Sequence, residues 1–313
     1  MRVPTKSIRC RTMLIVPLVA FVLCFTACGS TKEGANLLAA KAQDSVQTYK
    51  VAILHDTGYG PLAGETLDLC YPSNASTLRP GAILIHGGGW TGGDKKTNDT
   101  FCSSLASQGF VAAAINYRLT PKYVWPAQLV DAQLVVRWLR AQASLIHLNP
   151  QKLCAFGDSA GAHLALFLGT LPAIHAGDEA GLFANESPAV SCVVDEFGPT
   201  DLTQMLSTPY QRSLVLPLMH NLTPQADPAL YRDASPLFDV TSHSAAMLII
   251  QGTEDTIVPQ SHSLSLQQKL QQAHVPVNYI SFKGGHGFAG LDEQQKDTIQ
   301  MQVVNFLNAQ EHP

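Results

Sequence analysis

The sequence predicts an α/β domain in which helices cover both faces of a mostly parallel sheet of eight strands. Short apolar runs alternate along the chain with longer segments whose apolar residues recur every three or four positions. Parallel strands need such crossover helices between them, so the alternation favours a sheet buried on both faces. A serine between two glycines, in the stretch Gly157-Asp158-Ser159-Ala160-Gly161, directly follows one of the apolar runs. With 313 residues and 46% hydrophobic content, residues 48–313 can form one large domain.

The expected strands follow from runs of apolar, β-branched and aromatic residues. In chain order they are residues 51–54, 66–71, 82–86, 111–117, 153–156, 192–197, 247–251 and 277–282. We expect the first two to pair antiparallel. Helices are expected where Ala132, Val135, Val136, Leu139 and Ala143 form one apolar face, and also over residues 162–168, 261–273 and 293–309.

The segment of residues 200–243, between the sixth and seventh strands, breaks this rhythm with five prolines. Its apolar residues could form a small lid. They could equally form a satellite core under a long loop, and the sequence does not choose between the two.

The glycines around Ser159 point to a nucleophile elbow. A sharp strand-to-helix turn strains the serine backbone and leaves little room for a Cβ atom at either glycine. Ser159 would then sit at a helix N-terminus, where free amides face developing negative charge. By itself the pattern also fits an ordinary tight turn with a solvated serine.

A second motif, His86-Gly87-Gly88-Gly89-Trp90, follows the third strand. Its glycines can turn their amides inward, so Gly88 and Gly89, together with Ala160 after the serine, are the expected oxyanion-hole donors. A phosphate loop would need a lysine and a hydroxyl residue directly after the glycines, and Trp90-Thr91 does not supply them. Trp90 is a candidate wall of the substrate pocket.

An acid and a base follow the last two strands. Asp255 stands in Gly252-Thr253-Glu254-Asp255, and His286 stands in Gly284-Gly285-His286-Gly287. The chain order is therefore Ser159, Asp255, His286, in which His286 would act as the base and Asp255 would orient it. Glu254 is the alternative partner of the histidine.

At these motifs the chain resembles the esterase branch of the α/β-hydrolases. The stretch from His86 to Lys95, HGGGW-x-x-GDK, is most similar to the BD-FAE group of bacterial carbohydrate, feruloyl and acetyl-xylan esterases. Asn116-Tyr117-Arg118-Leu119, Trp125-Pro126-Ala127-Gln128 and Gly198-Pro199-Thr200-Asp201-Leu202 add to this resemblance. The HGGG loop is also similar to that of hormone-sensitive-lipase-like esterases, although no long helical cap precedes the first strand.

The resemblance implies a serine carboxylic ester hydrolase acting on short acyl esters, such as acetyl or feruloyl esters of carbohydrates, without a cofactor. An arylformamidase-like amidase and a small prolyl-oligopeptidase-like peptidase share the order of the triad. An adhesion module on the same fold is the non-enzyme alternative, and its usual sign is a lost triad residue.

The composition of the chain limits the classes of molecule that it is expected to bind. Charged residues make up only 14% of the chain, the formal net charge is −4, and basic clusters are missing from the expected domain, which argues against nucleic acid. The cysteines and histidines show no C-x-x-C or H-E-x-x-H spacing, so no metal site is expected. The expected partner is a small-molecule or carbohydrate ester.

The first 27 residues are expected to be a signal peptide. Four basic residues precede an apolar stretch over residues 13–25, which is short for a bilayer span. The following Thr26-Ala27-Cys28 resembles a bacterial lipobox, in which Cys28 would carry the lipid, with Phe25 as a departure from the pattern. Residues 28–47 are polar and are expected to form a tether. We therefore expect an exported protein, either lipid-anchored or released as a soluble protein.

Four further cysteines lie in the expected domain, namely Cys70, Cys102, Cys154 and Cys192. Export makes disulfides possible. Because a buried cysteine also behaves as a small hydrophobe, we expect these four to be free thiols.

Overall fold

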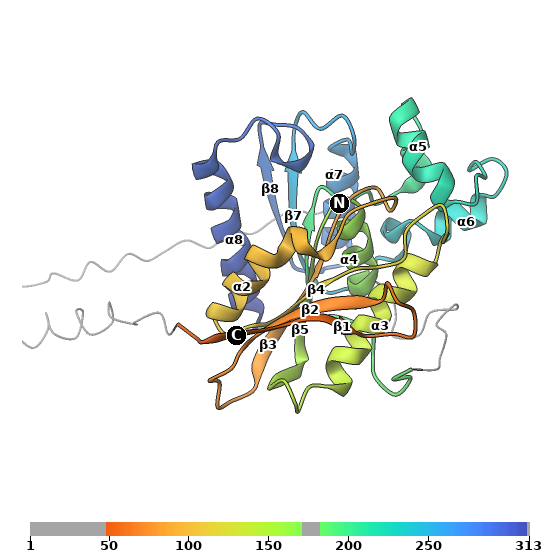
Figure 1. The fold of residues 1–313 in the computed structure, drawn as a ribbon. Coiled ribbons are helices and arrows are strands. Elements are labelled where there is room, and N and C mark those ends of the chain that lie inside the picture. Colours follow the sequence, from red (N-terminus) through yellow and green to blue (C-terminus); the bar gives the residue numbers. More distant parts are fainter. Residues whose placement is uncertain (1–47, 171–181, 312–313) are drawn as a thin grey trace, which may run out of the picture. The chain divides into compact units, whose positions relative to one another are not determined.

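The computed structural model describes residues 48–170 and 182–311. Their eight strands form one sheet in the order β1-β2-β4-β3-β5-β6-β7-β8 (Figure 1). The strands are β1 (Val51–Gly58), β2 (Thr66–Pro72), β3 (Arg79–Ile85), β4 (Val111–Ile115), β5 (Leu148–Asp158), β6 (Cys192–Glu196), β7 (Ala246–Gly252) and β8 (Val277–Phe282). β2 is antiparallel to both β1 and β4, and β4, β3, β5, β6, β7 and β8 pair in parallel. The predicted mostly parallel eight-stranded sheet is confirmed.

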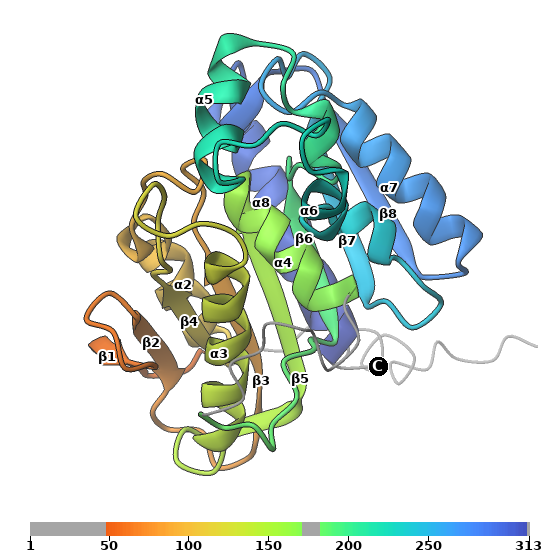
Figure 2. The same cartoon turned by 90° about the vertical axis from the view of Figure 1, so that its right-hand side faces the viewer.

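Helices cover both faces of the sheet (Figures 1 and 2). The α-helices are α2 (Asp99–Ser107), α3 (Ala127–Ala141), α4 (Ala160–Thr170), α5 (Pro209–Leu218), α6 (Pro228–Asp233), α7 (Ser261–Gln272) and α8 (Glu293–Glu311). Shorter 3-10 helices are η1 (Lys95–Asn98), η2 (Leu202–Gln204), η3 (Pro236–Asp239) and η4 (His286–Phe288). Helices α3, α4 and α7 pack on one face of the sheet and α2 and α8 on the other, so each face has its own hydrophobic core.

Helix α2 and strand β5 are among the elements that differ from the sequence prediction. Helix α2 was not predicted, because its sequence DTFCSSLAS is dominated by residues of modest helix propensity and shows only a short apolar face. Strand β5 begins at Leu148, earlier than expected, because Leu148 pairs with Arg79 of β3 before the apolar part of the strand starts. Both elements owe their structure to packing against the sheet.

The proline-rich segment between β6 and β7 does not form the satellite core that was one of the two alternatives. Met205, Leu218 and Met219 are buried in the main core and do not form a separate one. Helix α5 nevertheless stands beyond the end of the sheet (Figure 1), and its Tyr210 is exposed. Leu214 of α5 lies where a Cβ at Gly89 would be, so this helix covers the loop that follows β3.

The expectation of free thiols is wrong, since the structure pairs the four cysteines in two disulfides. Cys154 and Cys192 stand opposite each other in the register of β5 and β6, with Cα atoms 4.6 Å apart. Cys102 of α2 packs over Cys70 of β2, with Cα atoms 5.8 Å apart. All four belong to the core on the α2 and α8 face. Treating each cysteine as a separate small hydrophobe overlooked this packing in pairs.

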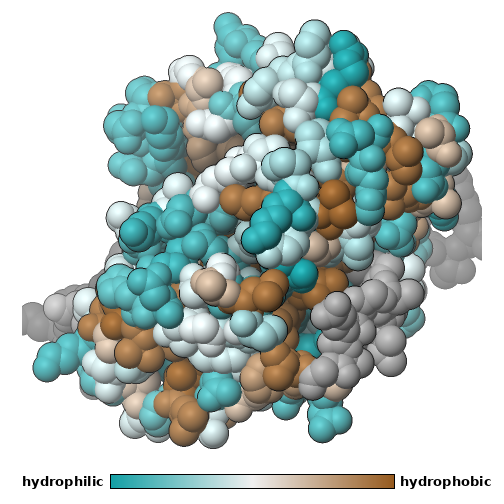
Figure 3. Space-filling view, turned by 45° about the vertical axis from the view of Figure 1, so that its right-hand side comes forward, coloured by the Kyte–Doolittle hydropathy of each residue, from teal (hydrophilic) through white to brown (hydrophobic). Residues whose placement is uncertain are grey.

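Among the described residues, no helix combines the length and the apolarity needed to cross a membrane. On the face seen in Figure 3, hydrophobic residues are interspersed with hydrophilic ones. The predicted signal peptide, the tether and Cys28 fall in residues 1–47, outside the described residues.

Candidate active site

The candidate nucleophile lies on a sharp turn between β5 and α4. Ser159 has a φ of 51°, a left-handed conformation that costs a non-glycine residue about 1–3 kcal/mol. A Cβ at Gly157 would meet the backbone of Gly161, and a Cβ at Gly161 would meet the carbonyl oxygen of Ile85. Glycine at both positions therefore lets the start of α4 approach β3 and β5 closely enough to form the turn.

The structure brings Ser159, His286 and Asp255 together at the carboxyl ends of β5, β7 and β8. The Nε2 atom of His286 lies 2.9 Å from the Ser159 Oγ, and its Nδ1 atom lies 2.7 Å from the Asp255 Oδ2. These distances suit a hydrogen-bonded relay from the hydroxyl through the imidazole to the carboxylate.

Asp255 is the carboxylate that the fold holds in place. Its Oδ1 accepts hydrogen bonds from the amides of Ile257 at 2.8 Å and Val258 at 2.9 Å. Its other oxygen is left for His286 and for the Gln251 side chain, which lies 3.2 Å away. The alternative acid, Glu254, is exposed. Asp255 is thus the acid that reaches the histidine.

The predicted oxyanion donors lie around Ser159. Gly88 has a φ of 110° and Gly89 a φ of 59°, backbone conformations that favour glycine. The neighbouring Gly87 amide donates to the Asp158 Oδ1 at 2.9 Å, which ties the loop to the residue before the nucleophile. In the described part of the chain, the amides of Gly88, Gly89 and Ala160 have no hydrogen-bond acceptor. They are therefore available to bind a negatively charged oxygen.

His86 supports this loop from beneath. Its ring stacks on Tyr117 at 4.5 Å between centroids, and its Nδ1 lies 2.7 Å from the Gly87 carbonyl oxygen. The Tyr117 hydroxyl donates to the His86 carbonyl at 2.9 Å. Burial lowers the pKa of His86, so the ring stays neutral near pH 7 and acts through hydrogen bonding and stacking.

A model of the BD-FAE family matches residues 67–270, more than half of the chain. The chain belongs to the BD-FAE family. The resemblance found in the sequence motifs is thereby confirmed. The match includes Ser159, Asp255 and the HGGG loop, and it ends before His286.

Curated relatives share this region. Esterase LipC of Mycobacterium tuberculosis is 29% identical over 258 residues, which cover 80% of this chain and 63% of LipC. Esterase LipQ of the same organism is 28% identical, over 74% of this chain and 56% of LipQ. The BD-FAE chain thus spans less than two thirds of the length of these relatives.

Solved structures share the fold. A truncated form of a carbohydrate esterase from gut microbiota has a TM-score of 0.71 at 26% identity, over 85% of this chain and 98% of that one. A bifunctional GH43-CE protein from Bacteroides eggerthii has a TM-score of 0.73 at 25% identity, over 83% of this chain and 35% of that one. These neighbours and the eight-stranded sheet confirm the predicted α/β-hydrolase fold.

Trp90, the predicted pocket wall, is buried in this BD-FAE chain. Its side chain is 1% exposed and meets the ring of His163 edge-on at 5.1 Å. The Nε2 of His163 lies 2.9 Å from the carbonyl oxygen of Ala234, and burial lowers the pKa of His163 to about 4. Both side chains have packing roles, and a contact between Trp90 and a substrate stays a prediction.

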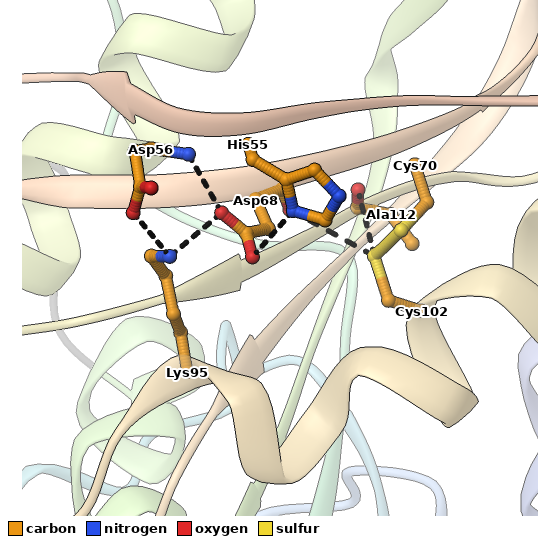
Figure 4. Close-up of a disulfide and its surroundings, with 7 residues drawn as sticks. All are labelled: His55, Asp56, Asp68, Cys70, Lys95, Cys102 and Ala112. Atoms are coloured by element: carbon orange, nitrogen blue, oxygen red, sulfur yellow. Dashed lines mark hydrogen bonds and ion pairs between the residues drawn. A yellow bond between two sulfur atoms is a disulfide. The ribbon is translucent and has the colours of Figure 1, made fainter.

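The loop that carries the predicted oxyanion donors, here called the oxyanion loop, runs from His86 to Lys95. A buried network of charged side chains anchors its end at Lys95, and the sequence analysis did not predict this network. Lys95 is 1% exposed, and its Nζ donates to the Asp68 Oδ1 at 2.7 Å and to the Asp56 Oδ1 at 2.8 Å. Figure 4 shows this network beside the disulfide that joins β2 to α2. The lysine of the GDK motif was the available signal, but its acidic partners lie in the preceding hairpin.

Within this network, the opposite charges of Lys95 and Asp68 stabilise the charged form of each side chain. Burial by itself would raise the pKa of Asp68, but hydrogen bonds from Lys95, the Asp56 amide and His55 outweigh it and lower that pKa. The same contacts raise the pKa of Lys95 against the opposing effect of burial. Within the described residues, no group of histidine, cysteine, aspartate and glutamate side chains could hold a metal ion.

Proposed function

We propose that this BD-FAE protein is a serine carboxylesterase that hydrolyses short acyl esters. The observation that carries the proposal is the relay from Ser159 through His286 to Asp255, formed beside three unused backbone amides. The esterase names of the curated relatives support the same reaction class.

The chemistry follows from the geometry. The Nε2 of His286 takes the proton of the Ser159 hydroxyl while its oxygen attacks the ester carbonyl carbon, and Asp255 stabilises the imidazolium. The carbonyl oxygen becomes an anion that the amides of Gly88, Gly89 and Ala160 can bind. Each such donor typically lowers the barrier by about 3 kcal/mol. His286 then protonates the leaving alcohol, and water repeats the sequence on the acyl-enzyme.

As the substrate class we propose acetyl or feruloyl esters of carbohydrates. The carbohydrate esterase among the structural neighbours supports this class, as does the match to the BD-FAE family. We expect p-nitrophenyl acetate or butyrate to be cleaved at least about tenfold faster than the palmitate, because Leu214 of α5 lies directly against the loop at Gly89. Acetylated xylan and methyl ferulate complete the substrate panel.

The decisive experiment replaces the nucleophile. Ser159→Ala is expected to abolish hydrolysis of p-nitrophenyl acetate while the melting temperature stays within a few degrees, because only a hydroxyl is lost. An organophosphate should label the peptide that contains Ser159. Activity above a few per cent of wild type in the alanine variant would rule out the serine mechanism.

We further propose that the protein is exported and anchored through a lipid on Cys28. The sequence pattern supports the anchor, and two disulfides in the domain support an oxidising compartment. Cys28→Ser should release the protein from the membrane fraction. Palmitate incorporation that survives this substitution would exclude lipidation at Cys28.

A further inference from the structure

A cavity of about 520 Å³ adjoins the triad on the α2 and α8 face of the sheet. It reaches Gly88 of the oxyanion loop, Asp158 before the nucleophile and Gly287 after the catalytic histidine. We call it the glutamate cavity; the lining residues that matter here are Asn98, Phe101, Glu196, Phe197, Phe288 and Gln300. The mechanism above uses none of these six side chains.

Glu196, at the end of β6, is the central polar group of this cavity. Side chains alternate along a strand, and the preceding Asp195 bonds the Gly198 amide on the α4 face, so Glu196 points to the α2 and α8 face. Glu196 is only 5% exposed, yet its carboxylate accepts no hydrogen bond from any residue in the described ranges. Its oxygens are not among the fully enclosed polar atoms, so they open onto the cavity, where a ligand or water can bond them.

Two carboxamides add to the unused hydrogen-bonding capacity. Asn98, at the end of η1, is 8% exposed, and its Nδ2 has no partner within residues 48–170 and 182–311. The Nε2 of Gln300, from α8, likewise has no partner in these ranges, although the residue as a whole is only partly buried. Three polar side chains from η1, β6 and α8 therefore converge on one cavity.

Aromatic rings form the walls between these polar groups. Phe197 meets Phe288 edge-on at 5.1 Å, and Phe101 meets Phe156, which also lines the cavity, at 5.0 Å. Phenyl rings offer flat apolar surface to another ring. Rings combined with carboxyl and carboxamide groups suit a ligand that is itself a ring carrying hydroxyl groups.

We propose that the glutamate cavity binds a neutral hydroxylated ring of the ester substrate, with Glu196, Asn98 and Gln300 as its hydrogen-bonding partners. The assignment rests on the proposed esterase function. Such a ring has two sources: the sugar of the alcohol part or the phenol of an aromatic acyl part. A linear alkyl chain would leave the three polar groups unpaired, and an anion would meet no basic group among the described lining residues other than the neutral ring of His86.

The state of Glu196 agrees with a neutral partner. Burial, and then the charges of Asp158 and Asp195, raise the pKa of Glu196 well above its ordinary value. The group therefore keeps its proton to higher pH than an exposed glutamate and can both donate to a hydroxyl and accept from one.

Pairs of esters that differ in ring hydroxyls test the proposal. Methyl p-coumarate is compared with methyl cinnamate, and a monoacetylated methyl xyloside with cyclohexyl acetate. In at least one pair, the wild type should prefer the hydroxylated member by tenfold or more in kcat/KM, and the pair concerned identifies the source of the ring. Glu196→Leu and Gln300→Leu should reduce that preference at least fivefold. Gln302→Leu, at an exposed position of the same helix, should leave it unchanged.

A second measurement separates this proposal from the catalytic one. Protein carrying Ser159→Ala should bind free p-coumarate methyl ester or methyl xyloside in calorimetry, and Glu196→Leu in that background, which removes both the donor and the acceptor, should weaken binding by tenfold or more. The cavity assignment alone would be overturned if an active wild type had equal kcat/KM for both members of each pair and the Ser159→Ala protein bound neither ring. Ring binding without any esterase activity of the wild type would overturn the proposed function and leave the cavity assignment standing.

Discussion

At the residue scale, the proposed reaction depends on the orientation of one imidazole. The main-chain amides of Ile257 and Val258 fix one oxygen of Asp255, which directs the other toward the Nδ1 of His286. A carboxylate held in this way keeps the proton of the neutral imidazole on Nδ1 and leaves Nε2 free to accept the serine proton.

Exchanging the acid for its amide tests this role. Asp255→Asn is expected to lower kcat by about four orders of magnitude, because an amide can stabilise the wrong tautomer of the histidine. Glu254→Gln is the matched control and should change kcat by less than about tenfold, because Glu254 is exposed. Steady-state kinetics with p-nitrophenyl acetate measure both. A larger loss from the Glu254 change than from the Asp255 change would reverse the assignment.

Asp195 makes the stability of the domain depend on pH. It is fully buried, and burial raises its pKa to about 7, against the lowering effect of the Gly198 amide. Between about pH 4 and pH 7 the folded protein holds a proton that the unfolded chain has lost, so this group makes the fold less stable as pH rises.

Asp195→Asn removes that titration. The free energy of unfolding of the wild type should fall relative to the variant by about 1.4 kcal/mol for each pH unit between pH 4 and pH 7. Urea unfolding of both proteins across this range measures the difference. Parallel curves for the two proteins would show that Asp195 titrates below this range.

The three residues of the proposed triad could be read from the sequence because each belongs to a local motif at the end of a strand. Glu196 and Asp195 could not, since their burial depends on which helices cover β6. The same holds for Trp90, whose burial against His163 depends on how the HGGG loop packs on α4.

At the scale of elements, the oxyanion loop is held at both ends. Its first residues join the core through His86 and Tyr117, and its last residues join β2 through the ion pair of Lys95 and Asp68. The glycines of the loop were visible in the sequence. The pairing of Lys95 with Asp68 was not, because it depends on the register that brings β2 next to β4.

Lys95→Met should therefore loosen the loop and destabilise the domain. Asp68 would remain buried with its main partner gone, which should cost about 3 kcal/mol of unfolding free energy. We expect kcat/KM to fall by about tenfold as well, because the oxyanion donors would lose their position.

The neighbouring lysine gives the control for this change. Lys96 is exposed, so Lys96→Met should alter the unfolding free energy by less than about 0.5 kcal/mol. Chemical unfolding and p-nitrophenyl acetate kinetics are measured on both variants. Equal behaviour of the two would mean that the buried ion pair does not support the loop.

At the scale of the whole domain, the two disulfides connect the fold with the proposed export. They close sequence separations of 32 and 38 residues, and the chain-entropy model assigns about 4 kcal/mol of stabilisation to each. Both lie within one core, where Cys70–Cys102 ties α2 to β2 and Cys154–Cys192 ties β5 to β6. The mostly parallel sheet covered on both faces was predictable from alternating strands and helices, whereas these cross-links depend on side chains meeting in register.

If the protein works outside the cytoplasm, these cysteines should be oxidised in the material recovered there. Unfolded protein from that material should show no reactive thiol at the four positions, whereas protein kept in a reducing cytoplasm should show all four.

Replacing Cys70 and Cys102 by alanine should lower the free energy of unfolding by about 2–4 kcal/mol, and a reducing agent should then act only through Cys154–Cys192. Because Cys70–Cys102 joins β2 to the helix that follows the Lys95 anchor, we expect this pair of changes to lower kcat more than the matched pair at Cys154 and Cys192. Four reactive thiols in the exported protein, with a melting temperature that a reducing agent leaves unchanged, would contradict the disulfides and remove their support for export.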